Sequence, residues 1–178
     1  MNYEAILYEV KDNILTITLN RPEKLNAFNF NMQSDLIDAI DKANNDDEVK
    51  AIIVTGAGRG YCAGADLSAG KDTFNMEARD DRKGAISENG EIDWSHSGVR
   101  DGGGRVTLKM FECLKPIISA CNGPAVGVGI TMQLAMDIRL ASEQAKYGFV
   151  FARRGLVPEA CSSWFLPRIV GVSKALEW

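Results

Sequence analysis

The sequence predicts an α/β fold in which short buried strands alternate with helices and pair into a parallel sheet. Two runs support this prediction, Ala51–Thr55 and Ile117–Cys121, because each is short and largely apolar and follows a helical pattern. A turn rich in glycine comes after each run, at 56–60 and at 123–129. This alternation of strand, loop and helix is typical of βαβ units.

Length and composition favour one globular domain, residues 1–178. The hydrophobic fraction of 46% and the charged fraction of 25% are ordinary for a soluble protein of this length. The net charge of −4 argues against a nucleic-acid partner, because such partners require a basic surface. No apolar stretch reaches the roughly 18 residues of a membrane span, and Met1–Glu4 lacks the features of a secretory signal. We therefore expect a cytoplasmic protein, or an organelle-matrix protein in a eukaryote.

The cysteines and the single histidine give no sign of a metal site. The cysteines lie far apart, without a Cys-x-x-Cys pair: Cys62, Cys113, Cys121 and Cys161. This spacing is typical of reduced thiols rather than of a disulfide framework or a zinc site. His96 has no second histidine to act with, so we expect no bound metal.

The first third of the chain predicts a hairpin, a loop and a helix. Tyr3–Val10 and Ile14–Leu19 alternate in polarity on either side of a turn at 11–13. Arg21–Ala27 follows as a loop. Apolar residues at helical spacing come next and predict a helix, which either Asn29 or Asn31 could cap. The apolar positions of the helix are Met32, Leu36, Ile37, Ile40 and Ala43.

Two glycine-containing segments resemble nucleotide motifs without matching them. The stretch Gly56–Tyr61 has Tyr61 where the dinucleotide fingerprint requires its last glycine. The stretch Gly64–Lys71 has Ala65 at a required glycine, and Asp72 follows where Ser or Thr is needed. We therefore reject both nucleotide-binding interpretations.

The middle of the chain combines a polar segment with a predicted helix. Residues 68–104 are polar, charged and rich in glycine, and we interpret them as a mobile insertion or lid that contains a solvated His96. Val106, Met110 and Leu114 then form a helical stripe that ends before Pro116.

The stretch Cys121–Asp137 joins a turn rich in glycine and proline to an uninterrupted apolar run. Such a run predicts a buried helix, with the turn at its mouth. A helix mouth presents unpaired N–H groups that can hold a negative oxygen. A plain connection between strand and helix, without a ligand, is the alternative, and this stretch alone leaves both open.

The last part of the chain predicts a strand at Asp137–Ala141 and an apolar run at Tyr147–Ala152. A helix should open within Val157–Ser163, and Pro167 should kink it or end it early. Ser173 should cap one further turn that reaches Trp178, where Leu176 and Trp178 have nothing to pack against. We expect the chain to be cut short at 178, or to be completed by a segment from elsewhere.

Two turns and one carboxylate are the candidates for chemistry. The turns at Cys62–Asp66 and Gly127–Gly129 follow neighbouring parallel strands, so their N–H groups could face each other and form an oxyanion hole. A nucleophilic serine or Cys62 is disfavoured, because no Gly-x-Ser-x-Gly elbow or activating base accompanies either. Glu159 lies at the predicted helix start, where it could be partly desolvated yet kept ionised by the helix end. The alternative is an ordinary first-turn glutamate.

Three motifs in order resemble those of the crotonase superfamily of enoyl-CoA hydratases and isomerases. They are Asn20–Ala27, Tyr61–Leu67, and Lys115–Gly123 together with Gly127–Gly129. The resemblance implies a crotonase-like spiral of repeated ββα units with an apparently truncated C-terminal helical region. It also implies a homotrimer or hexamer for a full-length chain.

What the resemblance implies about the site can be carried over residue by residue. It implies an acyl-CoA thioester as substrate, with CoA as part of that substrate and no separate cofactor. The backbone N–H groups of Ala65 and Val128 would form the oxyanion hole, although the family usually has glycine in place of Val128. The residues that would line the CoA moiety are Lys24, Leu25, Ala27, Ala63, Asp66 and Leu67.

The acid/base positions distinguish the branches of the superfamily. The two glutamates usual in its hydratases fall on Thr131 and Phe151 here, so both are missing. Glu159 resembles the catalytic position of peroxisomal-type Δ3,Δ2-enoyl-CoA isomerases. A 1,3 proton shift needs only one carboxylate, which favours an isomerase. A hydratase that relies on Glu159 alone and a catalytically idle CoA-binding subunit are the alternatives.

Overall fold

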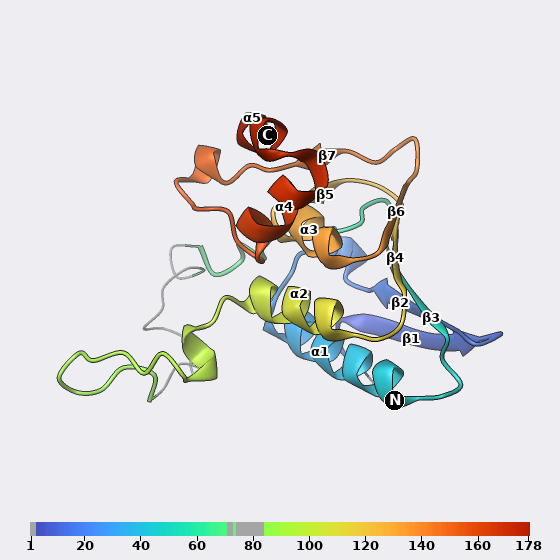
Figure 1. Ribbon diagram of the computed structural model, residues 1–178, viewed down its shortest axis with the longest axis horizontal. Helices are drawn as coiled ribbons and strands as arrows, with labels where there is room; N and C mark the ends of the chain where they lie inside the picture. The colour runs from blue at the N-terminus through green and yellow to red at the C-terminus, as the bar shows by residue number, and fades with distance from the viewer. Residues whose placement is uncertain (1–2, 71–72, 74–83) are drawn as a thin grey trace.

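The computed structural model describes residues 3–70, 73 and 84–178. Within these residues, one mixed sheet is antiparallel at its first pair of strands and parallel at each later pair (Figure 1). Its strands, in spatial order, are Ile6–Lys11 (β1), Ile14–Leu19 (β2), Ala51–Gly56 (β3), Ile117–Cys121 (β4) and Ile138–Ala141 (β6). Ala125–Val126 (β5) and Tyr147–Gly148 (β7) form a second, small parallel sheet. The predicted α/β class and its parallel strands are confirmed.

The hairpin of β1 and β2 closes on a tight two-residue turn. Asp12 and Asn13 have φ values of 51° and 63°, which is the left-handed backbone that hairpin turns of this length require. Asp and Asn tolerate this conformation better than most residues. The predicted hairpin is therefore confirmed. Its turn consists of Asp12 and Asn13, because Lys11 of the predicted turn 11–13 still pairs with Ile14.

A right-handed helical connection joins β2 to β3 and brings them into parallel pairing. It contains a short 3₁₀ helix, Pro22–Lys24, and then α1, Phe30–Asn45. The side chain of Asn29 accepts a hydrogen bond from the Met32 N–H at 2.9 Å, so Asn29 rather than Asn31 is the cap of α1. The Lys115 side chain donates to the carbonyls of Ala43 and Asp46 at the other end of α1.

Helix α2 spans Gly102–Glu112 and packs beside α1 (Figure 1). Its first turn is made of glycines that the sequence had assigned to the polar insertion. The helix can begin there because the Asp101 carboxylate accepts hydrogen bonds from the N–H groups of Gly103 and Gly104, at 3.2 and 2.7 Å. The prediction that Leu114 continues the buried stripe is wrong, because the helix ends before it and Leu114 is 90% exposed.

The predicted buried helix after β4 is present but short. Helix α3, Val128–Thr131, continues directly into a 3₁₀ helix, Met132–Ala135, and β6 follows. All four residues of α3 are buried. The turn of Asn122–Gly127 therefore lies at the mouth of a buried helix, as the sequence indicated.

The C-terminal part ends in two helices, as the sequence predicted. Helix α4 is Ser162–Val170 and opens inside the predicted segment 157–163, but only after Ala160 and Cys161, whose φ values of 52° and 57° cannot continue a right-handed helix. Pro167 lies inside α4 without ending it. A 3₁₀ helix at Ala152–Arg154 precedes this region.

Helix α5, Val172–Glu177, is capped by Gly171 rather than by Ser173. Trp178 does find a packing partner, because its ring stacks on Phe149 with centroids 6.1 Å apart. Leu176, in contrast, is 83% exposed, as expected for a residue without one.

The predicted insertion at 68–104 is only partly described. Residues 71–72 and 74–83 of it lie outside the described residues, as do Met1 and Asn2 of the N-terminus. The described part includes a 3₁₀ helix at Ser97–Val99, where the His96 Nδ1 accepts a hydrogen bond from the Gly98 N–H at 3.0 Å. That 68–104 is a mobile insertion stays a prediction.

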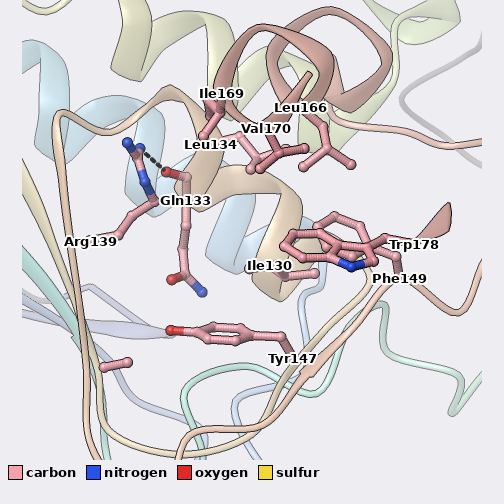
Figure 2. A pocket seen from close by; sticks show the side chains of 11 residues that line it. Ile130, Gln133, Leu134, Arg139, Tyr147, Phe149, Leu166, Ile169, Val170 and Trp178 are labelled. Carbon is pink, nitrogen blue, oxygen red and sulfur yellow. Dashed lines mark hydrogen bonds between the residues drawn. The ribbon is translucent and has the colours of Figure 1, made fainter. Parts of the chain in front are cut away.

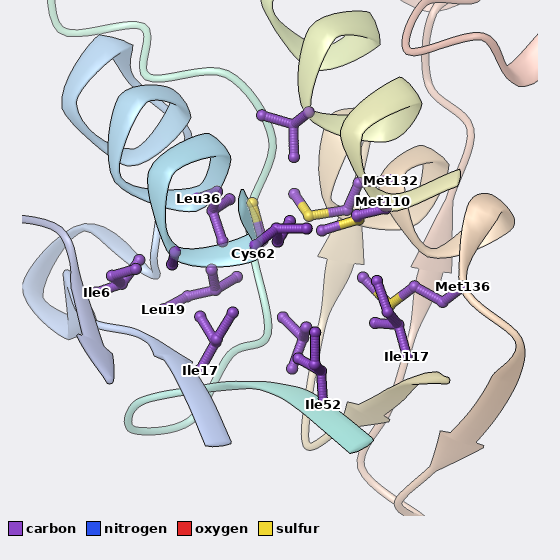
Figure 3. Packing of buried hydrophobic residues seen from close by; sticks show 14 of the residues in the cluster. Ile6, Ile17, Leu19, Leu36, Ile52, Cys62, Met110, Ile117, Met132 and Met136 are labelled. Atoms are coloured by element: carbon purple, nitrogen blue, oxygen red, sulfur yellow. The ribbon is translucent and has the colours of Figure 1, made fainter. Parts of the chain in front are cut away.

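The main hydrophobic core lies between α1 and the sheet and extends toward α2 and α3 (Figure 3). Leu36 of α1, Ile17 of β2 and Ile52 of β3 are fully buried in it. Burying each such side chain stabilises the fold by about 1.5 to 3 kcal/mol. None of the helices in the described part of the chain is long and apolar enough to cross a membrane.

The cap of α1 provides a matched test of this local structure. Asn29→Ala removes the acceptor for the Met32 N–H, so the free energy of unfolding should fall by about 1 kcal/mol. Asn31→Ala, which removes only an exposed contact to Glu4, should cost less than half as much. Urea denaturation measures both, and equal losses in the two variants would contradict the assignment of the cap.

Candidate active site

The two turns predicted to face each other lie in direct backbone contact. Cys62 and Ala125 form a parallel bridge, and the Val126 N–H donates to the Cys62 carbonyl at 2.9 Å. A Cβ atom at Gly129 would lie 2.2 Å from the Cys62 carbonyl oxygen. Only glycine permits this approach, and the predicted meeting of the two turns is therefore confirmed.

The N–H of Ala65 is left free by the pairing around it. Phe28 and Ala65 form a parallel bridge in which the Phe28 N–H donates to Gly64 and the Asp66 N–H donates to Phe28, both at 2.8 Å. The bridge uses the Gly64 carbonyl and the Asp66 N–H, which flank Ala65, so the N–H of Ala65 itself points away from Phe28. Within the described residues this N–H makes no hydrogen bond.

The N–H of Val128 also makes no hydrogen bond to any described residue, for a different reason. Val128 is the first residue of α3, and the first N–H groups of a helix have no partner inside it. Gly127 precedes it with a φ of 53°, a conformation that glycine adopts without strain. The valine keeps a right-handed helical backbone, so the replacement of the family's usual glycine does not remove the donor.

Glu159 lies just before α4, and not in its first turn as the sequence had suggested. Its Oε1 accepts a hydrogen bond from the Thr131 hydroxyl at 3.0 Å. Burial raises the pKa of Glu159 to about 7, the nearby negative charge of Asp101 adds to the rise, and the Thr131 hydrogen bond opposes it. Desolvation is the largest of these effects, in agreement with the expected partial desolvation of this carboxylate.

Gly103 is the point at which Glu159 and Val128 come together. A Cβ atom added to Gly103 would lie 2.7 Å from Glu159 Oε2, 2.9 Å from Val128 Cγ2 and 3.1 Å from the Ala160 Cβ. The carboxylate is therefore next to the residue that carries one of the two free N–H groups. Sequence reasoning missed Gly103, although the glycine run at 102–104 was a visible signal.

Asp101 holds the backbone around Glu159 in place. Besides capping α2, its Oδ2 accepts a hydrogen bond from the Ala160 N–H at 2.8 Å. Ala160 and Cys161 are consecutive left-handed residues that are not glycine, which is a strained arrangement often found at functional sites. Sequence reasoning also missed Asp101, although an aspartate before a glycine run is a typical helix cap.

The residues predicted to line CoA lie on two adjoining segments. The Ala63 N–H donates to Leu25 at 3.0 Å, and the Lys24 ammonium lies 3.4 Å from the Ser68 hydroxyl. Asp66 pairs with Arg21 at 2.8 Å, and hydrogen bonds led by that from the Ser68 hydroxyl lower the pKa of Asp66 to about 2. Arg21 was missed by the sequence reasoning. The contacts with CoA themselves stay a prediction for Lys24, Leu25, Ala27, Ala63, Asp66 and Leu67.

The remaining candidate groups do not add a nucleophile or a cluster of metal ligands. Burial raises the pKa of Cys62 to about 12, so its thiol stays protonated near neutral pH. Across residues 3–70, 73 and 84–178, no three His, Cys, Asp or Glu side chains gather in a way that could hold a metal ion.

A cavity opens beside Ile130 of α3 and the 3₁₀ helix that follows it (Figure 2). It encloses about 570 Å³, and its walls are mostly apolar. Ile130, Gln133 and Leu134 line it, whereas Val128 and Thr131 of the same helical segment face Glu159 and α2. The cavity is therefore separate from the two free N–H groups and the carboxylate.

Comparison with known proteins agrees with this arrangement. Residues 9–178 match the family model described as Enoyl-CoA hydratase/isomerase. The chain is 41% identical to Enoyl-CoA hydratase ACTT3 of Alternaria alternata, over 93% of this chain and 50% of that protein. It is 35% identical to the 1,2-epoxyphenylacetyl-CoA isomerase of Escherichia coli, over 97% of this chain and 61% of that protein. The chain thus spans roughly half to three fifths of these relatives.

Solved structures show the same fold. A putative enoyl-CoA hydratase from Streptomyces coelicolor superimposes with a TM-score of 0.80 at 29% identity, over 99% of this chain and 59% of that one. The family match, the fold and the order of the motifs agree over nearly the whole sequence. The chain therefore belongs to the enoyl-CoA hydratase/isomerase family, the crotonase superfamily that its motifs resemble.

Proposed function

We propose that this chain carries the active site of a Δ3,Δ2-enoyl-CoA isomerase, with Glu159 as the single acid/base. The observation that carries the proposal is the position of Glu159, whose carboxylate lies beside Val128 and has only the Thr131 hydroxyl as a hydrogen-bond partner in the described residues. One oxygen of the carboxylate therefore remains available for a substrate proton.

Asp101 is the other carboxylate nearby, and its hydrogen bonds argue against a second acid/base role. Three backbone N–H groups, those of Gly103, Gly104 and Ala160, already donate to its two oxygens. These hydrogen bonds occupy lone pairs on both carboxylate oxygens, which leaves Asp101 fewer positions from which to contact a substrate. Hydration of a double bond calls for a base and an acid, whereas a 1,3 shift calls for one group that serves as both. This difference favours the isomerase over the hydratase.

In the proposed reaction, the 3-enoyl thioester places its carbonyl oxygen at the N–H groups of Ala65 and Val128. Glu159 removes a proton from the α-carbon, and the electrons of that C–H bond move into a dienolate whose negative oxygen the two N–H groups stabilise. The same carboxyl group then returns the proton to the γ-carbon, which leaves the double bond conjugated with the thioester. A pKa near 7 suits a group that must accept and give back a proton at neutral pH.

The substrate class, the assembly and the compartment belong to the proposal as well. The relatives include proteins named as hydratases and one named as an isomerase, so an acyl-CoA thioester is the shared substrate chemistry. A hydratase based on Glu159 alone and an idle CoA-binding subunit remain the competing proposals. A homotrimer or hexamer, and a cytoplasmic or organelle-matrix location, rest on the sequence alone.

Replacing the carboxylate tests the reaction directly. Glu159→Gln should lower kcat for isomerisation of 3-enoyl-CoA by about 10²- to 10⁴-fold, because it removes the acid/base group. Glu177→Gln, which alters an exposed glutamate paired with Lys174, is the matched control and should behave as wild type. The assay follows conversion of 3-enoyl-CoA, with 2-enoyl-CoA offered in parallel to detect hydration. Undiminished isomerisation by Glu159→Gln would rule out the mechanism, and binding without turnover by wild type would favour the idle subunit.

The pH profile offers an independent test. Glu159 must be ionised to remove the first proton, and burial raises its pKa to about 7. The value of kcat/KM should therefore fall as the pH drops through about 7 and level off above it. Initial rates between pH 4 and pH 9 measure this limb. A limb at the ordinary glutamate pKa near 4.5 would show that Glu159 is not the base, or that it is not desolvated.

A further inference from the structure

The hydroxyl of Thr131 lies between two acceptors that belong to different parts of the site. Its Oγ1 is 3.0 Å from Glu159 Oε1 and 3.2 Å from the carbonyl oxygen of Gly127. Thr131 is fully buried, so water does not compete for this group. A hydroxyl has one hydrogen, and it can donate to only one of the two acceptors at a time.

The Gly127 carbonyl belongs to the same peptide unit as the Val128 N–H. A hydrogen bond donated to a peptide carbonyl polarises the peptide and makes its N–H a stronger donor. Whether the Thr131 hydroxyl donates to Glu159 or to Gly127 therefore affects the Val128 N–H, one of the two groups proposed to hold the thioester oxygen.

The protonation state of Glu159 determines which of these two acceptors receives the Thr131 hydrogen bond. An ionised carboxylate is a stronger acceptor than a neutral carbonyl, so the hydrogen points to Glu159 while that group is charged. Once Glu159 is protonated, its Oε1 is either a neutral carbonyl oxygen or an O–H donor. In both cases the Thr131 hydrogen bond to Glu159 weakens relative to that to the Gly127 carbonyl, which also accepts the N–H groups of Ile130 and Thr131.

We propose that Thr131 is a positioning residue that couples proton uptake by Glu159 to the donor strength of the Val128 N–H. The inference rests on the proposed isomerase function and deepens it. When the α-carbon proton moves to Glu159 and the electron pair of the C–H bond moves to the thioester oxygen, the Thr131 hydrogen turns to Gly127. The Val128 N–H then becomes stronger at the step in which the negative charge forms on the oxygen that it holds.

The other ionisable groups around Glu159 leave this coupling intact. Asp101, from the cap of α2, accepts hydrogen bonds from three backbone N–H groups, and its negative charge adds to the rise in the pKa of Glu159. Burial raises the pKa values of both Cys62 and Cys161, so these thiols stay protonated near neutral pH. Glu159 is therefore the group whose charge changes in the pH range of the proposed reaction.

A purely structural role makes a different prediction. Threonine hydroxyls often bond to the carbonyl four residues earlier in a helix, and the contact with Gly127 has this form. In that case loss of the hydroxyl would change stability and leave the titration of Glu159 where it was.

The test compares Thr131→Val with Thr131→Ser, which keeps a hydroxyl. Thr107→Val is the matched control, because Thr107 is also fully buried but its hydroxyl has no hydrogen-bond partner in the described residues. The first readout is the titration of the Glu159 carboxyl in the free protein. It is followed by ¹³C NMR of protein with carboxyl-labelled glutamate and identified by the signal that Glu159→Gln lacks. The second readout is kcat for 3-enoyl-CoA isomerisation on the high-pH plateau.

Thr131→Val should move the Glu159 titration to higher pH, because the carboxylate loses the donor that it has in the described residues, and should lower the plateau kcat about tenfold. Thr131→Ser should keep the Glu159 titration and the plateau kcat close to those of wild type. Thr107→Val should change neither the titration nor kcat. An unshifted titration in Thr131→Val would overturn the proposal, and so would a shifted titration with an unchanged plateau kcat. A wild-type protein without isomerase activity would refute the proposed function instead, and the NMR titration would still decide whether Thr131 controls Glu159.

Discussion

The candidate site depends on the close backbone contact between the turn at Cys62–Ala65 and the turn at Ala125–Gly129. The bridge between Cys62 and Ala125 places the second turn against the first, and Gly129 permits a separation that any side chain would prevent. Helix α3 begins at this contact, so its position is set by backbone atoms rather than by packing of side chains. This contact therefore positions the N–H groups of Ala65 and Val128, and also the Thr131 hydroxyl one turn further along α3.

Two neighbouring carboxylates have opposite environments. Asp101 receives three backbone N–H hydrogen bonds, whereas Glu159 receives one from a hydroxyl and is otherwise desolvated. Burial favours the neutral form of Glu159, and the negative charge of Asp101 adds to the rise in its pKa. Asp101 therefore holds the backbone in place, whereas Glu159 can exchange a proton near pH 7.

Sequence patterns predicted the strands well because each strand depends on local polarity and on clear turn residues. The hairpin turn at Asp12 and Asn13 and the buried run at Ala51–Thr55 are examples. The patterns failed where distant contacts override local preference. Ala160 looks like a helical residue in the sequence, yet its N–H is held by Asp101, which lies 59 positions away. The same contact explains why the helix begins only at Ser162, inside the predicted segment 157–163, and why Glu159 lies before it. The meeting of the two glycine turns could be predicted, because the ends of parallel strands share one edge of a sheet.

The glycines at the start of α2 have a consequence for the local stability of the site. A Cβ atom at Gly103 would displace the Glu159 and Val128 side chains, and a Cβ atom at Gly102 would displace the Gln33 side chain. Each glycine costs about 1 kcal/mol of helix stability relative to alanine. The first turn of α2 should therefore open more readily than the rest of that helix, with faster amide hydrogen exchange at its N–H groups. Each opening would release Asp101 from its cap, and the strained peptide after Glu159 would lose its support at the same moment.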